Sequence, residues 1–258
     1  MKYHIILSIV FFYFTLVGFS QKTVQANQIL NNIKEEKAIS YKNTTVQGVL
    51  DFTFIKEAIQ HLPSKKKWIN NSNEVNKLIK SSITFINCTF TGDVLAYIPD
   101  KETGYTFTAS FEDNVIFKNC VFEKKALFKY SEFKKECDFS ESKFKDDSSF
   151  KYSKFKNNTH FENTYFENLT TFKYAVFNTF ISFENSIFND SATFKYTQFK
   201  NGVSFKNTNF KEDLDIKYTK VWGNFNISNM KVGYDIDSKY TKINGHSFSK
   251  YLINTPQN

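Results

Sequence analysis

The sequence predicts an all-β solenoid, a chain wound into short stacked coils, and three observations support this. Phenylalanine supplies 31 of the 258 residues, whereas Gly and Pro number only 8 and 3. Between residues 111 and 210 phenylalanine recurs at alternating steps of six and five. The tripeptide Phe-Lys-Tyr returns every 22 residues. Together these observations indicate one repeated unit that uses most of the aromatic residues.

The spacing assigns a direction to each side chain. After the last phenylalanine of the run the same steps continue through Ile216, Val221, Ile227 and Val232, lapse at Ser238 and return at Ile243. Two residues before most of these sites stands a small residue, for example Cys120, Ser153 or Thr208. Residues two apart on an extended chain share a face. Each short strand therefore points a small residue and a phenylalanine inward.

Two other architectures do not fit this spacing. Steps of five and six do not stay on one face of a helix with 3.6 residues per turn. An ordinary sheet needs turn residues between its strands, and Gly and Pro are scarce. A solenoid remains.

The unit itself resembles a known family. Three of its copies are Cys120-Val121-Phe122-Glu123-Lys124, Ser153-Lys154-Phe155-Lys156-Asn157 and Thr208-Asn209-Phe210-Lys211-Glu212. This pattern resembles the pentapeptide-repeat proteins, most closely a Phe-rich subgroup with alternating steps of five and six. The resemblance implies a right-handed, four-sided parallel β-helix with four repeats per coil.

Surface positions support a 22-residue coil independently. Phe-Lys-Tyr begins at residues 128, 150, 172 and 194, and Ile216-Lys217-Tyr218 and Ser238-Lys239-Tyr240 follow in the same register. A second column shares the period, with asparagine at residues 119, 163, 185, 207 and 229 and Glu141 in place of one member. Because two steps of five and two of six make 22, we expect these residues to stack directly above one another.

The N-terminal residues predict export. Lys2 precedes an apolar run from Ile5 to Val17, and Gly18 and Ser20 place small residues before a cleavage site at Gln21. Residues 1–20 therefore have the form of a signal peptide, and the run is shorter than the roughly 20 residues of a spanning helix. We expect a secreted or periplasmic protein with no transmembrane segment in the mature chain.

The basic residues bear on the partner. The formal net charge is +8, and every basic residue is lysine because the chain contains no arginine. Arginine is the preferred residue for bidentate contacts with bases and phosphates, so we expect no nucleic-acid partner. An anionic envelope polymer or membrane surface fits the charge better, and a general abundance of lysine in the source is the simpler explanation.

The remaining segments interrupt or cover the coils. A short helix over about residues 24–37, with Ala26, Ile29, Leu30 and Ile33 as its apolar stripe, should cap the first coil. We assign residues 21–40 to an N-terminal cap and residues 41–245 to the β-helix domain. Two insertions interrupt this domain: a Lys-rich, partly helical one at 53–81, and one at 91–110 that contains a hairpin of strands 94–98 and 105–109. Residues 246–258 form a C-terminal cap and tail with Phe248, Tyr251 and Leu252.

Cysteine and histidine suggest little chemistry. Cys88, Cys120 and Cys137 all occupy the small inward position, which favours buried free thiols. A bridge between Cys88 and Cys120 requires the hairpin to loop out and bring both onto one face. His61, His160 and His246 are far apart, and none forms a recognisable catalytic motif, so we expect neither catalysis nor a cofactor nor a metal.

The Lys-Tyr column is the most distinctive surface feature. As a binding site it would present aromatic rings and amines to a sugar or an anionic polymer; as structure it would be a corner column that shields the backbone. The candidate binding residues are Lys151, Tyr152, Lys173, Tyr174, Lys195, Tyr196 and Tyr218.

An acidic column forms a second candidate. Asp213 should lie over Asp235, and Asp215 over Asp237. Stacked like charges are destabilising unless calcium or the nearby Lys211, Lys217 and Lys239 intervene. Glycoside cleavage by such carboxylates would need a cleft with substrate subsites, of which the sequence gives no sign.

Three functions remain from these observations. The first is an exported, non-enzymatic scaffold or protein-interaction module of the bacterial envelope or exterior. The second is binding of a carbohydrate or anionic polymer by the Lys-Tyr column. The third, and weakest, is a polysaccharide-active enzyme. The partner, protein or glycan, is left open, as is a homodimer.

Overall fold

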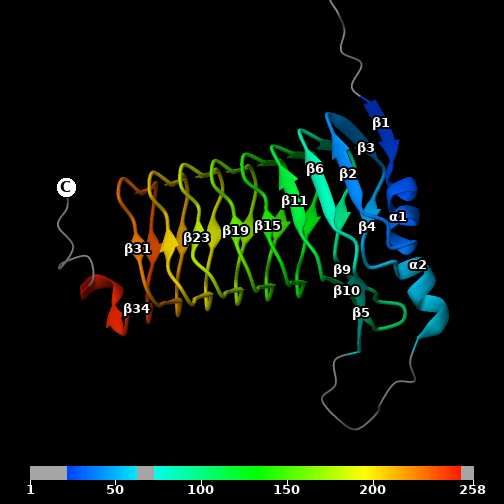
Figure 1. The fold of residues 1–258 in the computed structure, drawn as a ribbon. Coiled ribbons are helices and arrows are strands. Elements are labelled where there is room, and N and C mark those ends of the chain that lie inside the picture. The colour runs from blue at the N-terminus through cyan, green and yellow to red at the C-terminus, as the bar shows by residue number, and fades with distance from the viewer. Residues whose placement is uncertain (1–21, 63–72, 251–258) are drawn as a thin grey trace, which may run out of the picture.

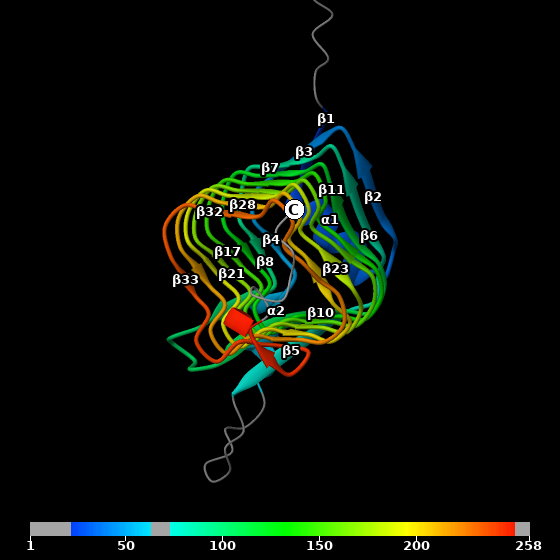
Figure 2. The same cartoon turned by 90° about the vertical axis from the view of Figure 1, so that its left-hand side faces the viewer.

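The computed structural model describes residues 22–62 and 73–250, and these form a rod of stacked four-sided coils (Figure 1). Viewed along the rod, successive coils superpose (Figure 2). The chain passes through four sheets in each turn, which we call B, A, C and D in chain order, and within each sheet neighbouring coils pair in parallel. The predicted four-sided parallel β-helix is confirmed. The predicted signal peptide lies outside the described residues.

Most strands contain only two residues. Sheet A comprises β1 (Lys22–Gln25), β3 (Thr44–Gln47), β7 (Thr89–Phe90), β12 (Val121–Phe122), β16 (Lys143–Phe144), β20 (Tyr165–Phe166), β24 (Ile187–Phe188), β28 (Asn209–Phe210) and β32 (Lys231–Val232). Sheet B comprises β2 (Ile39–Lys42), β6 (Ile83–Ile86), β11 (Val115–Lys118), β15 (Cys137–Asp138), β19 (Thr159–His160), β23 (Ile181–Ser182), β27 (Val203–Ser204) and β31 (Phe225–Asn226).

The other two sheets complete the coil. Sheet C comprises β4 (Leu50–Asp51), β8 (Val94–Leu95), β13 (Ala126–Leu127), β17 (Ser148–Ser149), β21 (Thr170–Thr171), β25 (Ala192–Thr193), β29 (Leu214–Asp215) and β33 (Ile236–Asp237). Sheet D comprises β5 (Glu74–Ile79), β10 (Thr106–Phe111), β14 (Glu132–Phe133), β18 (Lys154–Phe155), β22 (Val176–Phe177), β26 (Gln198–Phe199), β30 (Lys220–Val221) and β34 (Lys242–Ile243), with β9 (Tyr97–Pro99) and β35 (His246–Ser247) pairing antiparallel to β10 and β34.

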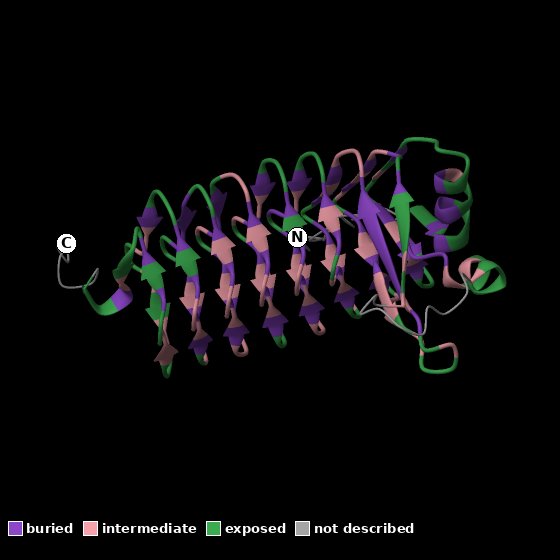
Figure 3. Cartoon of the chain, turned by 90° about the horizontal axis from the view of Figure 1, so that it is seen from below, coloured by how far each residue is buried: buried purple, intermediate pink, exposed green. Residues whose placement is uncertain are grey.

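The register follows the predicted 22-residue period. Phe133 pairs with Phe155, and Phe155 pairs with Phe177. Buried residues alternate with intermediate or exposed ones along most strands, so purple lies beside pink or green along the coils in Figure 3. From residue 111 on, paired residues of parallel strands are therefore 22 positions apart, whereas across the insertions the separation is 32 or 44, as in Val115 with Ile83 and Ile39 with Ile83.

Phenylalanine rings fill the interior by stacking along the rod. Phe161 is fully buried, and its centroid lies 5.2 Å from that of Phe139 and 5.4 Å from that of Phe183, with interplanar angles of 15° and 17°. Around the coil the same ring meets Phe150 and Phe172 edge to face, at 82° and 88°. Offset stacks and edge-to-face contacts are the two favourable geometries for aromatic pairs. Phe161 makes both, as do Phe150 and Phe172.

The small inward residues bond to the backbone. The hydroxyl of Ser153 donates to the carbonyl of Phe128 at 2.6 Å, and that of Thr197 donates to Phe172 at 2.8 Å. The same bond, to the carbonyl 25 residues earlier, recurs at Thr164, Ser186, Thr208 and Thr219. These carbonyls also accept turn-closing N–H groups, as Phe128 does from Ser131 at 3.1 Å. A buried hydroxyl without a partner would be costly, so Ser and Thr fit this position because an acceptor is at hand.

The N-terminal end has a strand that the sequence did not predict. β1 pairs with β3 over its whole length, with Lys22 opposite Thr44. Helix α1 (Ala26–Lys34) then occupies the place of two sheets and buries Ala26, Ile29, Leu30 and Ile33 against the first coil. The predicted apolar stripe is the face of the helix that is buried. The helix begins later than predicted because residues 24 and 25 belong to β1, and it ends at Lys34.

The two insertions are narrower than predicted. α2 (Ile55–Ala58) and η1 (Ile59–His61) leave the rod after β4, and residues 63–72, including Pro63 and Trp68, lie outside the described part. Residues 74–79 were assigned to this insertion, but they form β5 and pair with β10 along six residues. In the second insertion the hairpin strands are β9 and β10, whereas Val94 and Leu95 belong to sheet C. The rod resumes after both insertions without a slip in register.

The C-terminal end is covered in part by β35 and by Phe248, which is buried and packs edge to face on Phe225. The other two predicted cover residues, Tyr251 and Leu252, are outside the described part. Among the helices of residues 22–62 and 73–250, none is both long and apolar enough to cross a membrane.

Replacing a central ring tests the stacking. Phe161→Ala removes six aromatic contacts at a site that cannot collapse, because the coils above and below are fixed by their own backbone pairing. We expect a loss of about 3–5 kcal/mol in the free energy of unfolding, measured by guanidinium denaturation. Lys154→Ala, an exposed change on the preceding strand, should stay within about 0.5 kcal/mol. Equal losses for the two variants would contradict this account of the core.

Candidate functional site

The Lys-Tyr column lies at the corner between sheets C and D. Each Tyr is the third residue of a tight turn: the Ser153 N–H donates to the carbonyl of Phe150 at 3.1 Å, and Tyr152 between them has a φ of 61°. Left-handed conformation costs a non-glycine residue about 1–2 kcal/mol. It recurs in the six tyrosines Tyr130, Tyr152, Tyr174, Tyr196, Tyr218 and Tyr240. A compensating interaction must therefore hold the aromatic residue there.

That interaction is a continuous stack of tyrosine rings. The centroids of Tyr152 and Tyr174 are 4.6 Å apart with planes 3° from parallel, and Tyr174 and Tyr196 repeat the distance at 1°. Such pairs contribute about 0.5–1.5 kcal/mol each. The stack therefore offsets part of the turn strain. The corner-column hypothesis from the sequence has a physical basis in this stack.

The stack also limits what the column can bind. Each internal ring has both faces covered by its neighbours, so a sugar cannot stack on Tyr152, Tyr174, Tyr196 or Tyr218 without separating the coils. At the N-terminal end Tyr97 packs obliquely against Tyr130, 6.0 Å away. The column presents ring edges, hydroxyls and amines, a surface for hydrogen bonds and charges.

The lysines of this column, which we call the lysine column (Lys129, Lys151, Lys173, Lys195, Lys217 and Lys239), lie over the tyrosines. The ammonium group of Lys151 is 5.2 Å from the centroid of Tyr152, and Lys173 and Lys195 repeat this contact at 5.4 and 5.6 Å. Lys217 instead forms an ion pair with Asp237. In the described part of the chain, the other five members have no carboxylate within ion-pairing distance.

The charges in this column repel one another. Burial lowers the pKa of Lys151, and the ammonium groups of Lys129 and Lys173 above and below lower it further. Burial also raises the pKa of Tyr152 and Tyr196. Stacked like charges without counter-ions are unfavourable. An anion placed along the column would relieve this repulsion.

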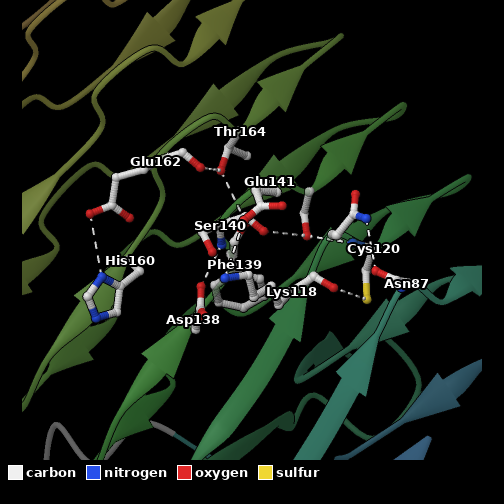
Figure 4. Close-up of polar contacts among 12 residues, drawn as sticks. Asn87, Lys118, Cys120, Asp138, Phe139, Ser140, Glu141, His160, Glu162 and Thr164 are labelled. Carbon is white, nitrogen blue, oxygen red and sulfur yellow. Dashed lines mark hydrogen bonds and ion pairs between the residues drawn. The ribbon is translucent and has the colours of Figure 1, made fainter. Parts of the chain in front are cut away.

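The asparagine column lies at the opposite corner and has a structural role. These residues take left-handed turns like the tyrosines, with Asn185 at a φ of 58°. Their side-chain amides form a ladder: Asn207 donates to Asn185 at 3.0 Å, and Asn229 donates to Asn207 at 3.0 Å. At Glu141 the ladder is broken, and this carboxylate pairs with Lys118 at 3.3 Å (Figure 4).

The acidic column lies on sheet C and at its preceding corner. Asp215 pairs in register with Asp237, and Asp213 accepts the backbone N–H of Asp235 at 3.1 Å. Lys217 forms an ion pair with Asp237, which offsets the expected repulsion between the stacked carboxylates and lowers the pKa of Asp237. Lys211 bonds to Asn189 instead. Among the residues that the structure describes, no group of His, Cys, Asp and Glu is arranged to hold a metal, so calcium stays a hypothesis.

A shallow groove, which we did not predict from the sequence, lies beside these carboxylates. Its volume is about 460 Å³, and it crosses the outer face of sheet C from Leu127 to Asp215 past Ser149, Thr171 and Thr193. Asp215 accepts hydrogen bonds from Lys217 N–H at 2.9 Å and from the Thr193 hydroxyl at 3.5 Å. Most of the accessible lining surface is apolar, and Asp213 is among the lining residues.

The hairpin does bring two cysteines together. Because Val121 pairs with Thr89, Cys120 lies next to Cys88 on the neighbouring coil. Both are buried free thiols, as is Cys137, which stands alone on sheet B. A hydrogen bond from Cys120 lowers the pKa of Cys88 to about 7, while burial raises the pKa of Cys120 and of Cys137.

Sheet B places Asp138, His160 and Ser182 in one line, 22 residues apart, an order that the sequence contained and that we did not predict. These side chains do not bond to one another. The His160 Nδ1 faces Glu162 at 3.4 Å, and Asp138 accepts the N–H of Ser140 at 2.7 Å (Figure 4). The Ser182 hydroxyl accepts the N–H of Glu184 at 3.1 Å. The line is therefore no Ser-His-Asp relay, which needs those hydrogen bonds.

Comparison with known proteins agrees with the repeat. Residues 107–154, 150–198 and 172–220 match the family described as pentapeptide repeats, a model of nine copies. A search of curated proteins found no match for the chain.

One variant tests whether the tyrosine stack stabilises the turns. Tyr174→Ala keeps the left-handed strain but loses contacts with Tyr152 and Tyr196, so we expect the free energy of unfolding to fall by about 1–3 kcal/mol. Tyr174→Phe keeps the stack and should fall within about 0.5 kcal/mol of the parent. Denaturant titration measures both. An unchanged midpoint for Tyr174→Ala would show that the stack contributes nothing.

Proposed function

We propose that this pentapeptide-repeat chain is an exported, non-enzymatic scaffold or protein-interaction rod of the bacterial envelope or exterior. The observation that carries the proposal is that inward residues of each coil form the core, whereas outward residues form the surface columns. Inward positions are filled by stacked phenylalanines and by hydroxyls bonded to the backbone. Outward positions form straight columns along the rod. Such a surface can present many identical contacts in a line, which suits a long partner.

Export rests on the N-terminal sequence. Lys2, the apolar run from Ile5 to Val17 and the small residues Gly18 and Ser20 have the form of a signal peptide with a cleavage site before Gln21. Cleavage there would give a mature chain that starts at Gln21.

The mature N-terminus is directly measurable. We expect the tagged chain, expressed in a bacterial host, to appear in the periplasm or medium with Gln21 as its first residue. Mass spectrometry of the intact protein and N-terminal sequencing give this result. A chain that keeps residues 1–20 and stays in the cytoplasm would contradict export.

Binding of an anionic polymer by the lysine column is a second candidate function. It is supported by the five members other than Lys217, which lack a carboxylate partner in the described part of the chain. Since the tyrosine faces are covered, charged polymers fit this column better than neutral sugars. The candidate contacts are the amines of Lys151, Lys173 and Lys195 and the hydroxyls of Tyr152, Tyr174, Tyr196 and Tyr218.

Charge removal tests this candidate without breaking the stack. Changing Lys151, Lys173 and Lys195 together to Gln should weaken binding to a panel of acidic cell-wall and algal polysaccharides by about tenfold or more at low salt. Changing Tyr152, Tyr174 and Tyr196 to Phe keeps the ring stack and measures what the hydroxyls contribute. Changing the exposed Lys206 and Lys231 to Gln, away from the column, is the control for rod integrity. Equal binding by the Lys variant and the parent would exclude the column as the site. Release of reducing ends from any polymer would instead favour an enzyme.

A further inference from the structure

The side of the rod formed by sheet D is strongly basic. Between residues 129 and 245 this side holds thirteen lysines and one carboxylate, Glu132. Six of the lysines form the lysine column. Three are outward residues of sheet D (Lys154, Lys220 and Lys242), and four lie within two residues after its strands (Lys134, Lys135, Lys156 and Lys200). The excess of twelve positive charges exceeds the +8 of the whole chain. The remainder of the protein is therefore net negative, and the charge is segregated onto this side, which we call the lysine face.

The C-terminal part of this face lacks counter-charges. Lys220 pairs in register with Lys242, so their side chains project from adjacent coils. Lys200 lies on the coil next to Trp222, one residue beyond the pair Phe199 and Val221. All three lysines are exposed, and none has an ion-pair partner within residues 22–62 and 73–250. The repulsion between them is unrelieved in the isolated chain.

An aromatic ring stands among these lysines. Trp222 is 43% exposed, and it does not belong to the tyrosine stack. The turn that carries it is held firmly: the Gly223 N–H donates to the Asn244 side chain at 2.8 Å, and that side chain donates back to the Gly223 carbonyl at 2.9 Å. Trp222 thus offers an accessible indole surface on a rigid base, which the internal tyrosines cannot.

From this arrangement we infer that Trp222, Lys200, Lys220 and Lys242 form a binding site for an acidic polysaccharide built from uronic acids. The indole would stack on a sugar ring, and the lysines would pair with carboxylates on the neighbouring sugars. Adjacent coils lie about 4.8 Å apart, a spacing of the same order as one sugar unit in an extended chain. The polymer would therefore run along the rod, one sugar to a coil.

Nucleic acid fits this site less well. The chain has no arginine, and a phosphate backbone is recognised best by the planar, bidentate guanidinium group. A site that relied on lysine charge alone would also leave Trp222 without a role. The inference goes beyond the lysine column proposed above, and it depends on export only for where the polymer would be met.

Calorimetric titration of the purified secreted chain with sodium polygalacturonate tests the site. We expect Trp222→Ala to weaken binding about tenfold or more. The pair Lys220→Gln with Lys242→Gln should weaken it and flatten its dependence on salt. Tyr234→Ala, which removes a 75% exposed ring between sheets A and C, is the matched aromatic control. Lys206→Gln with Lys231→Gln is the matched charge control, and both controls should stay within about twofold of the parent.

The outcomes separate cleanly. Binding of polygalacturonate by Trp222→Ala as tightly as by the parent would overturn the site. So would equally tight, Trp222-independent binding of duplex DNA, polyphosphate or phosphatidylglycerol vesicles, because that would mean charge attraction alone. A failure here concerns purified protein and leaves the export proposal standing. Conversely, retention of the chain in the cytoplasm would overturn export without changing the measured affinity.

Discussion

The structure depends on the match between the centroid spacing of offset-stacked aromatic rings and the spacing of parallel strands. Strands pair about 4.8 Å apart, and the phenylalanine rings of adjacent coils stack with centroids 4.5 to 5.5 Å apart, as in Phe122 over Phe144 and Phe128 over Phe150. Backbone pairing and ring stacking therefore require the same distance between adjacent coils along the rod. A coil can add to the rod only if each of its four sides places a side chain that suits this spacing.

The same in-register stacking governs the outside of the rod, where it acts for some residues and against others. Tyrosine and asparagine benefit, because rings stack and amides bond in ladders. Lysine and aspartate are destabilised by this stacking, because each charge lies next to a charge of the same sign 22 residues away. The charged columns are thus the places where the isolated chain is least satisfied. That is why the candidate binding surfaces lie there and not in the core.

Several features could be predicted because they repeat locally. The 22-residue coil, the inward phenylalanines and the stripe of Ala26, Ile29, Leu30 and Ile33 follow from spacing alone. The Lys-Tyr column could be located, but its ring faces could not be known to be covered, since that depends on side-chain orientation across coils. Trp222 was overlooked because it occurs once, and a search for periodicity passes over single residues.

The sequence by itself determined the class of fold, the length of the coil and the direction of most side chains after residue 110, because these depend on contacts that repeat at a constant separation. Only the tertiary structure decided where the chain rejoins the rod after each insertion. Residues 74–79 return as β5, and the hairpin sets Cys88 beside Cys120. Such closures depend on pairing between segments separated by a loop, and the local pattern carries no information on where the loop ends.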